Sequence, residues 1–473
     1  MTKKVQIEEE ILHRIGQVAD RESVAAYVVG GYIRDLLLGK SVKDIDVVVV
    51  GDGVQFAGTI AQELGTGKPV VFEKFGTAML HVGERKLEFV GARKESYNQD
   101  SRKPVVSGGT LAEDLSRRDF TVNAMAVSLN RETLGLLEDP HHGTKDLEAR
   151  ILRTPLEATA TFSDDPLRMM RAARFASQLG FEVEASVREA MMTMRERISI
   201  VSQERITDEF LKIMTSPRPS VGLLLLFETG LMEGVFPEVA QLAGVEQRME
   251  YHHKDVLRHT LKVVDNIAEA TENVWLRMAA LLHDIAKPKT KAFKEGIGWT
   301  FHGHEELGAR MVKQIFRRMR FPLEHLPYVE GLVRLHLRPM ALVDQEVTDS
   351  AVRRLMFDAG KDVDDLMMLC RADITSKNPR LVEQVRKNYD AVIRKMGEVE
   401  EKDRIRNWQP PLRGEEIMNV LNLEPGPSIG DLKDAITDAI LDGLIPNDHD
   451  AALGYLFKIK DEVLSHPSKS PRR

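Results

Sequence analysis

Cysteine is nearly absent from the chain, which contains only Cys370 among 473 residues. A single thiol excludes an internal disulfide and a zinc site built from several thiolates, so a reducing compartment is expected. No apolar run approaches the ~18 residues that would suggest a membrane span. The first residues, MTKKVQIEEE, contain no apolar segment of the kind that a secretory signal requires. We therefore expect a cytoplasmic, globular protein with no membrane partner.

Aromatic residues are also scarce, at 6%, while Leu, Met, Ala, Arg and Glu are frequent in the second half and favour helices. An excess of positive charge is lacking, because the formal net charge is −7. A nucleic-acid binder with this charge must gather its cations on one surface. Candidate clusters are Arg317 with Arg318 and Arg320, Arg117 with Arg118, and the tail with Lys469, Arg472 and Arg473. A solvated helix face or a frayed terminus explains each cluster equally well.

The periodicity of apolar residues divides the chain into a mixed first part and a helical remainder. Residues 4–22 predict an amphipathic helix, and the polar residues 92–115 predict a loop. Short apolar runs predict strands at 26–29, 45–50, 75–82 and 86–90. From 164 to 465 helical periodicity dominates, with almost no strand alternation. A chain of this length is expected to form several domains.

Paired carboxylates give the strongest chemical signal. Asp44 and Asp46 flank one residue at the start of a predicted strand, so alternation places both on one face and Ile45 on the other. Glu88 stands between Leu87 and Phe89 in the same way. Carboxylates gathered on one face suit Mg²⁺, which keeps few protein ligands and binds substrate phosphates. Three of them can hold two metal ions.

Gly30 and Gly31 lie between a predicted strand and a predicted helix. Backbone without side chains can approach a triphosphate there, with the helix N-terminus adding N–H groups and Arg34 adding a cation. Taken alone, a Gly-Gly pair is usually a turn and an Asp-x-Asp pair is usually a surface feature. Their order along the chain (strand, glycines, helix, acidic strand) favours a phosphate-binding site.

Four ordered segments resemble the class II tRNA nucleotidyltransferases, which include CCA-adding enzymes and bacterial poly(A) polymerases. They are GGYIRD, DIDVVVV, RRDFTVNAMA at 117–126 and DDPLRMMRAARF at 164–175. The resemblance covers about the first half of the chain and implies a polymerase-β-like head. It implies that Asp44 and Asp46 bind the catalytic Mg²⁺ ions and, less directly, that Glu88 joins them. It also implies that Arg118, Asp119 and Asn123 contact the ribose and phosphates of a nucleotide.

The segment at 164–175 predicts a helix with Asp165 as N-cap, Pro166 at its first position, and Arg168, Arg171 and Arg174 on one face. A capped helix with a basic stripe is the plain interpretation. Since Asp only accepts and Arg only donates, a pair of Asp165 and Arg168 would accept cytosine and adenine and refuse uracil and guanine. In the resembling family these positions select CTP and ATP, and the arginines also touch the triphosphate. We interpret the charged residues at 204–212 as structural.

Histidine and aspartate recur in the helical half, at His259, His283, Asp284 and Asp373. Imidazole and carboxylate together suit a divalent metal such as Mg²⁺ or Mn²⁺. With 14 histidines in the chain, one His-Asp pair could also arise by chance. The surrounding AALLHDIAKPKT resembles the HD phosphohydrolases, and this implies that the four residues hold a metal that activates water.

We therefore predict an α+β protein in which a small mixed-sheet head is followed by an all-α neck, body, HD domain and tail. The expected boundaries are a head at 1–150, a neck and body at 151–245, an HD domain at 246–390 and a tail with a disordered end at 391–473. CCA addition to tRNA from CTP and ATP is the leading function, with the loop at 92–115 implied to help switch nucleotides. HD hydrolysis of phosphate or 2′,3′-cyclic phosphate ends is a further expectation. Poly(A) polymerase activity, or an HD phosphohydrolase with an RNA-binding head, are the alternatives.

Overall fold

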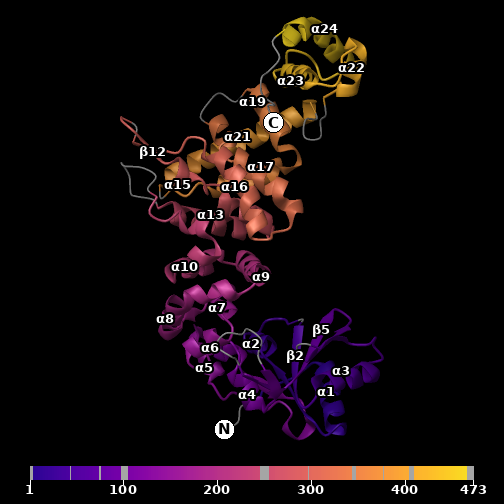
Figure 1. Cartoon of the computed structure of the whole chain (residues 1–473), viewed down its shortest axis with the longest axis vertical. Helices are drawn as coiled ribbons and strands as arrows, with labels where there is room; N and C mark the ends of the chain where they lie inside the picture. Colours follow the sequence, from indigo (N-terminus) through magenta and orange to yellow (C-terminus); the bar gives the residue numbers. More distant parts are fainter. Residues whose placement is uncertain are drawn as a thin grey trace. The chain divides into compact units, whose positions relative to one another are not determined.

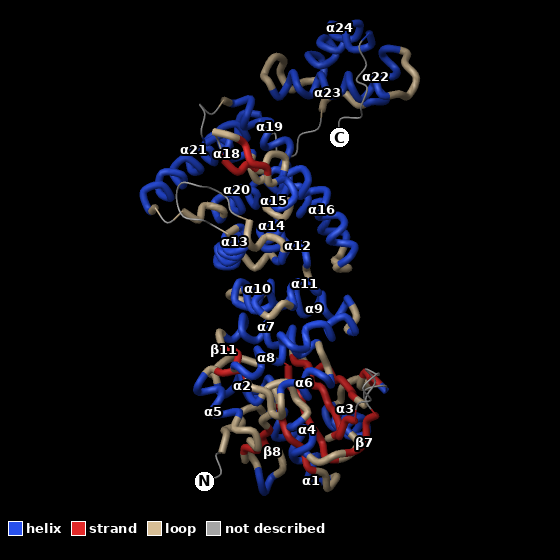
Figure 2. The backbone as a smooth tube through the Cα atoms, turned by 60° about the vertical axis from the view of Figure 1, so that its left-hand side comes forward, coloured by secondary structure: helices blue, strands red, loops and turns tan. Residues whose placement is uncertain are grey.

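The chain divides into two compact units, Met1–Ala240 and Gln241–Arg473, in a computed structural model (Figure 1). The residues described are 4–42, 44–73, 76–96, 105–245, 255–296, 298–343, 348–376, 378–403 and 410–465. Strands gather in the first unit, whereas helices dominate the second (Figure 2). The predicted α+β class, with a mixed-sheet head followed by helical domains, is confirmed. No helix among the described residues is long and apolar enough to cross a membrane.

A seven-stranded sheet in the order β3-β4-β5-β2-β1-β8-β9 forms the head. Only β2 and β5 pair in parallel, while the other neighbours are antiparallel. The strands are β1 (Ala25–Val29), β2 (Asp44–Val50), β3 (Val70–Phe72), β4 (Thr77–Val82), β5 (Arg85–Gly91), β8 (Ala126–Ser128) and β9 (Leu137–Glu138). The runs predicted as strands therefore form the centre of this sheet.

Helices α1 (Glu10–Arg21) and α3 (Gly53–Leu64) cover one face of the sheet. Val47 and Phe89 point into the core below them, together with Leu12 and Phe56 from these two helices. Because side chains alternate along a strand, the neighbouring residues of β2 and β5 point to the opposite face. This face packs against α4 (Leu111–Ser116) through Leu115, whereas α2 (Gly31–Leu37) packs Tyr32 and Ile33 into the core on the side of α1 and α3.

The segment at 92–115 is more regular than the predicted loop. It contains the hairpin of β6 (Arg93–Ser96) and β7 (Val105–Gly108) and the start of α4 (Leu111–Ser116), while 97–104 lie outside the described residues. Thr110 and Glu113 form a capping box that starts α4, a local signal that the polar composition concealed. The predicted helix at 4–22 begins later, at Glu10.

Short helices connect the head to a helical stack within the first unit. The head ends with η2 (Thr121–Asn123), η3 (Arg131–Thr133), α5 (Gly143–Ala149) and β10 (Ile151–Leu152), which pairs in parallel with β11 (Glu182–Val183). The stack comprises α6 (Ala158–Asp164), α7 (Leu167–Leu179), α8 (Ala185–Met194), η4 (Arg195–Ile200), α9 (Gln203–Met214), α10 (Pro219–Glu228), α11 (Leu231–Val235) and α12 (Pro237–Ala240). Helix α7 packs against α9 and α10, so its basic face lies near α9.

The described residues of the second unit are helical apart from one hairpin, β12 (Ala292–Lys294) with β13 (Gly298–Thr300), which the sequence did not predict. Its first helices are α13 (Val256–Ala270), α14 (Val274–Leu282), α15 (Lys287–Thr290), α16 (His304–Arg318), η5 (Leu323–His325), α17 (Leu326–Leu335) and α18 (Arg338–Val343). They are followed by α19 (Asp349–Ala359), η6 (Gly360–Asp362), α20 (Val363–Ala372), α21 (Pro379–Asp403), α22 (Gly414–Leu421), α23 (Pro427–Leu441) and α24 (His449–Ser465). The last three helices share their own apolar core.

Candidate functional site

Three carboxylates share the sheet face opposite α1 and α3. Asp46 on β2 and Glu88 on β5 are directly opposed in the parallel ladder, and Asp44 lies two residues before Asp46. Ile45 is fully buried, Asp46 is half-buried and Asp44 is exposed, as the alternation predicts. Burial raises the pKa of Asp46, and the nearby Arg118 opposes that rise. A bound cation would relieve the cost of keeping these carboxylates ionised side by side.

The turn between β1 and α2 approaches these carboxylates closely. Gly30 has φ +70°, a conformation that favours glycine. A Cβ atom there would lie 2.9 Å from Arg118 Nη1 and 3.5 Å from Asp46 Oδ2. The absent side chain therefore leaves open the space between the Arg118 guanidinium and the Asp46 carboxylate.

A buried polar network links Asp119 to both sides of the site. Asp119 Oδ1 accepts from Asn123 Nδ2 at 3.0 Å and from the Phe120 N–H at 2.8 Å, and Oδ2 accepts from Arg171 Nε at 2.7 Å. Asn123 Oδ1 in turn accepts from Arg34 Nη1 at 2.8 Å. Burial alone would raise the pKa of Asp119, but the Arg171 charge and these hydrogen bonds hold it well below its usual range. Asp119 is therefore a fixed anion that orients cations around the site.

Asp114 is a site residue that the sequence analysis missed. Its side chain is fully buried on α4, and its two oxygens accept from Arg117 Nη2 at 2.6 Å and Arg118 Nη2 at 3.1 Å. Burial opposes the charge, but these two guanidinium groups lower the pKa of Asp114. The spacing of three and four residues on a helix could have revealed this contact.

The three arginines of α7 point toward the same space. Arg168 is 9% exposed and donates to the Arg117 carbonyl oxygen at 2.5 Å and to that of Thr161 at 3.3 Å. The Arg174 guanidinium lies 4.2 Å above the ring of Phe175. Ordered guanidinium groups of this kind suit the oxygens of a triphosphate.

These groups line one pocket of about 780 Å³, within the ~300–1,000 Å³ range of small-molecule sites. The pocket is lined by Gly30, Gly31, Arg34, Asp46, Thr77, Glu88, Val90, Arg93, Arg117, Arg118, Asp119, Asn123, Asp165, Leu167, Arg168, Arg171, Arg174, Phe175, Gln178 and Arg205. Of the nucleotide-site residues predicted from the sequence, all line it except Asp44, which lies on the same strand face as Asp46. The pocket thus combines a carboxylate wall with a cationic wall.

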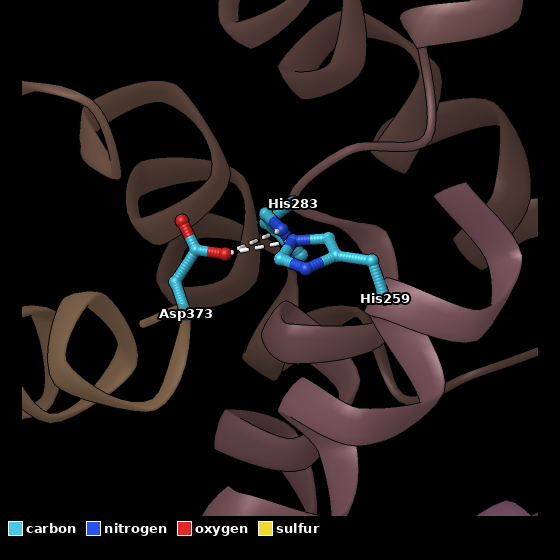
Figure 3. A group of neighbouring side chains, drawn as sticks. All are labelled: His259, His283 and Asp373. Atoms are coloured by element: carbon cyan, nitrogen blue, oxygen red, sulfur yellow. Dashed lines mark ion pairs between the residues drawn. The ribbon is translucent and has the colours of Figure 1, made fainter. Parts of the chain in front are cut away.

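A second cluster lies in the helical unit. His259 from α13, His283 from the end of α14 and Asp373 from the end of α20 point toward one another (Figure 3). His259 Nε2 lies 2.8 Å and His283 Nε2 lies 3.5 Å from Asp373 Oδ1. Asp284 Oδ2 lies 3.2 Å from His283 Nε2. The four residues predicted as an HD set are therefore in contact.

His304 and His336 extend this cluster, although the sequence analysis did not include them among the ligands. His304 Nε2 lies 3.4 Å from Asp284 Oδ1 and 3.3 Å from His336 Nε2. Asp284 therefore faces His283 with one oxygen and His304 with the other. His252 and His253, which the sequence left unassigned, lie outside the described residues.

Comparison with known proteins agrees with this geometry. The poly(A) polymerase head domain matches residues 26–153, the probable RNA- and SrmB-binding site of polymerase A matches 180–242, and the HD domain matches 256–376. The CC-adding tRNA nucleotidyltransferase of Thermus thermophilus is 31% identical over 448 residues, covering 91% of this chain and 93% of that protein. The chain belongs to the tRNA nucleotidyltransferase family.

Further relatives of this nucleotidyltransferase differ in the additions that their names state. The A-adding tRNA nucleotidyltransferase of Deinococcus radiodurans is 32% identical over 425 residues, covering 88% of this chain and 91% of that protein. A solved tRNA nucleotidyltransferase, complexed with a primer tRNA and an incoming ATP analog, is 26% identical with a TM-score of 0.57, covering 81% of this chain and 99% of the other. The CCA-adding enzyme of Bacillus stearothermophilus, in complex with CTP, shares the fold with a TM-score of 0.64 at 23% identity, covering 97% and 99%.

Asp165 of this nucleotidyltransferase contacts a residue of another helix, which the sequence did not predict. Arg205 Nη2 donates to Asp165 Oδ2 at 2.7 Å, whereas Arg168 donates to backbone carbonyls. Asp165 Oδ1 accepts from the Leu167 N–H at 3.1 Å, so it caps α7, which begins one residue later than predicted. Asp165, Arg168 and Arg205 therefore all line the pocket.

The charged residues at 204–212, which the sequence analysis interprets as structural, include side chains that contact or line the pocket. Glu209 is 3% exposed and contacts Arg174 Nε at 2.9 Å and Lys212 Nζ at 3.2 Å, while Arg205 lines the pocket. Their helical spacing suggested a solvated face, because local charge patterns do not reveal the packing of α9 on α7. The Glu209 carboxylate thereby positions the Arg174 guanidinium.

The HD cluster of the nucleotidyltransferase has a donor set that fits a divalent metal. The Nδ1 atoms of His283, His304 and His336 each lie 2.7 Å from a backbone carbonyl oxygen, which directs Nε2 toward the cluster. His283 Nε2 and Asp373 Oδ1 are buried without a hydrogen bond of good geometry. Burial opposes protonation of His283, but Asp284 and Asp373 raise its pKa to about 10, so a cation there would replace a tightly held proton.

Proposed function

We propose that this nucleotidyltransferase adds CCA to the 3′ end of tRNA, using CTP and ATP. The observation that carries the proposal is that Asp46 and Glu88 share one pocket with Arg118, Arg171 and Arg174. Carboxylates on one wall suit metal ions, and guanidinium groups on the other suit a triphosphate. The tRNA-directed names of relatives that span nearly the whole chain support the same substrate.

The reaction is an in-line attack of the RNA 3′-hydroxyl oxygen on the α-phosphorus of the nucleotide, with pyrophosphate leaving. Mg²⁺, when bound by Asp44, Asp46 and Glu88, would lower the pKa of that hydroxyl and neutralise phosphate charge. Arg118 is held by Asp114, and Arg171 by Asp119, so both cations are positioned before the nucleotide arrives. Such preorganisation lowers the cost of aligning the phosphates.

Base selection belongs to Asp165 and Arg205 in this proposal. The Asp165 carboxylate accepts a hydrogen bond from a base amino group, and the Arg205 guanidinium donates to a ring nitrogen. Cytosine and adenine present that pair of groups, whereas uracil and guanine present the reverse. Arg168 holds the nearby backbone in place through its bonds to the Arg117 and Thr161 carbonyls.

The test is extension of a tRNA that lacks its 3′ CCA, with Mg²⁺ and with each nucleotide separately and together. We expect two additions from CTP, a third when ATP is present, and then arrest. Asp46→Asn removes a metal-binding charge and should abolish all additions. Glu132→Gln changes an exposed carboxylate outside the pocket and should leave them unchanged.

The products separate this proposal from its alternatives. Arrest after two additions from CTP would indicate a CC-adding enzyme, and addition of A only to a tRNA that ends in CC would indicate an A-adding enzyme. A long tail from ATP alone on any RNA would indicate a poly(A) polymerase. Each of these outcomes would overturn full CCA addition.

The cluster of His259, His283, Asp284 and Asp373 supports a second activity, the hydrolysis of phosphate or 2′,3′-cyclic phosphate at RNA 3′ ends. The supporting observation is the convergence of imidazole and carboxylate atoms in a buried site, two of which lack a hydrogen bond of good geometry. Release of phosphate from a 3′-phosphorylated oligonucleotide, with Mg²⁺ or Mn²⁺, tests it. His283→Gln should abolish release while tRNA extension continues, and Asp46→Asn should do the reverse. Release that survives His283→Gln would contradict the assignment.

A further inference from the structure

The hairpin β12–β13 joins α15 to α16 (Figure 1) and carries two aromatic residues, Phe293 and Trp299. Phe293 and Trp299 are directly opposed across the two strands, with ring centroids 5.3 Å apart and edge to face. Phe293 is 58% exposed, an unusual environment for a large apolar side chain in this structure. Gly296 and Gly298, the first residue of β13, both have positive φ, a conformation that favours glycine.

Two lysine side chains lie over aromatic rings between the hairpin and the HD cluster. Lys291 Nζ lies 4.3 Å above the Trp299 ring, and Lys287 Nζ lies 5.6 Å above the Phe301 ring. Phe301 directly follows the end of β13, two residues after Trp299. Lys287 Nζ also lies 2.7 Å from Asp284 Oδ2. A row of rings and cations thus leads from the hairpin to a metal-binding carboxylate.

The far end of this row is fixed to the same cluster by the backbone. The Phe301 carbonyl oxygen lies 2.7 Å from His304 Nδ1, one of the histidines that face Asp284. Among the residues that the structure describes, neither Lys289 nor Lys294 takes part in an ion pair. The exposed lysines Lys289 and Lys294 outnumber the one exposed carboxylate of the hairpin, Glu295, so the surface beside the rings carries a net positive charge, which favours an anionic ligand with flat rings over an apolar one.

We propose that this hairpin binds the terminal nucleotide of an RNA whose 3′-phosphate or cyclic phosphate lies at the HD cluster. The terminal base stacks on Trp299 and Phe293, and Lys287 and Lys291 lie beside the phosphates. The inference rests on the proposed hydrolase activity and adds its substrate class, since the site then prefers phosphate esters that carry a base. Stacking of a base on an aromatic side chain is sequence-tolerant, as a processing site for many RNA ends requires.

The first test compares two substrates in the full chain with Mn²⁺, a short oligonucleotide 3′-phosphate and glycerol 2-phosphate, which has no base. Trp299→Ala should raise the KM for the oligonucleotide roughly tenfold or more, since each stacked base contributes that order of affinity. The values for glycerol 2-phosphate should not change. An equal loss on both substrates, or no loss on either, would overturn the proposal.

A matched control is available in the last helix. Phe457 is 48% exposed with Lys460 Nζ 5.7 Å above its ring, so it repeats the exposed ring and lysine away from the cluster. Phe457→Ala should leave both substrates unaffected. If it weakened the oligonucleotide as much as Trp299→Ala does, nonspecific stacking would explain the result and the proposal would fail.

A binding measurement separates this inference from the hydrolase activity on which it rests. In the His283→Gln chain, which should not hydrolyse, the oligonucleotide 3′-phosphate should quench Trp299 fluorescence, identified as the signal lost in Trp299→Phe. Quenching without hydrolysis in the parent chain would refute the hydrolase and retain the hairpin as an RNA-end site. Absence of quenching would overturn the inference. If the parent chain were a dimer and Phe293→Ala a monomer, the rings would belong to a contact between copies, and the inference would also fail.

Discussion

The Arg205 guanidinium holds the Asp165 carboxylate at 2.7 Å across the gap between α9 and the start of α7. Asp165 is thereby fixed at both oxygens, because its other oxygen accepts from the Leu167 N–H. A carboxylate with both oxygens held keeps one orientation toward the pocket. Discrimination between bases then depends on two helices that are distant in the sequence.

Arg205→Ala should reduce kcat/KM for CTP and ATP roughly tenfold, because Asp165 loses its orientation and the base loses a donor. The discrimination against UTP and GTP should also weaken in Arg205→Ala. Thermal stability should change little, since the Arg205 side chain is 48% exposed and such ion pairs contribute little. Steady-state kinetics with each nucleotide on tRNA lacking CCA would measure this.

Arg21→Ala is the matched control, because Arg21 forms a similarly exposed pair with Glu63 at 2.9 Å and does not line the pocket. It should leave all four nucleotides unaffected. Unchanged selectivity in Arg205→Ala, with normal values in Arg21→Ala, would show that base recognition lies elsewhere.

The head site was predictable where it depends on local periodicity. Alternation along β2 places the side chains of Asp46 and Ile45 on opposite faces of the sheet. The same rule applied to β5 places Glu88 on the same face as Asp46. The mixed-sheet head and the helical remainder follow from the change of apolar period along the chain. The contact between His283 and Asp373 was suggested only by resemblance, since the two residues come from distant helices.

Features that depend on tertiary packing were not predictable. Arg205 was not among the predicted site residues, yet it reaches Asp165 from another helix. Glu209 reads as one member of a solvated charge pattern, but packing of α9 on α7 buries it against Arg174. The strands β12 and β13 have three residues each, which is too short for an alternation of apolar and polar residues to be recognised in the sequence.

Asp119→Asn should destabilise the metal-free protein at neutral pH by about 2 kcal/mol, because hydrogen bonds to a charged group are lost or weakened. The folded pKa of Asp119 lies well below its ordinary value, mainly through Arg171 acting against burial. Its contribution is therefore fully present above the unfolded pKa of about 3.9 and is lost as pH falls through the folded pKa. Denaturant unfolding of both proteins from pH 7 to pH 3 measures the difference.

The difference in the free energy of unfolding should be constant from pH 7 to about pH 5 and shrink below about pH 4. Asp208→Asn, at an exposed position on α9, should show no difference at any pH. A gap that grew on acidification would mean that the folded pKa is raised and not lowered.

Divalent metal should stabilise the HD domain through its own ligands and not through the head. Mn²⁺ at 100 times its dissociation constant should raise the free energy of unfolding of that domain by about 2.7 kcal/mol. Asp373→Asn, which removes the carboxylate that faces His259 and His283, should abolish this gain. Calorimetric scans with and without a chelator measure it, and persistence of the gain in Asp373→Asn would exclude the cluster as its source.

Gly30→Ala tests whether the gap between Arg118 and Asp46 is needed for nucleotide binding. The new methyl group would meet Arg118 Nη1 at 2.9 Å, and Asp114 restrains that guanidinium, so it cannot retreat freely. Gly39 provides the control, because its φ is also +70° but nothing lies within 4 Å of its Cβ position. Both substitutions place a side chain at positive φ and cost backbone strain, yet only Gly30→Ala should raise the KM for CTP and ATP. Equal kinetic losses in the two variants would assign the effect to backbone strain alone, and the open space at Gly30 would then have no role in binding the triphosphate.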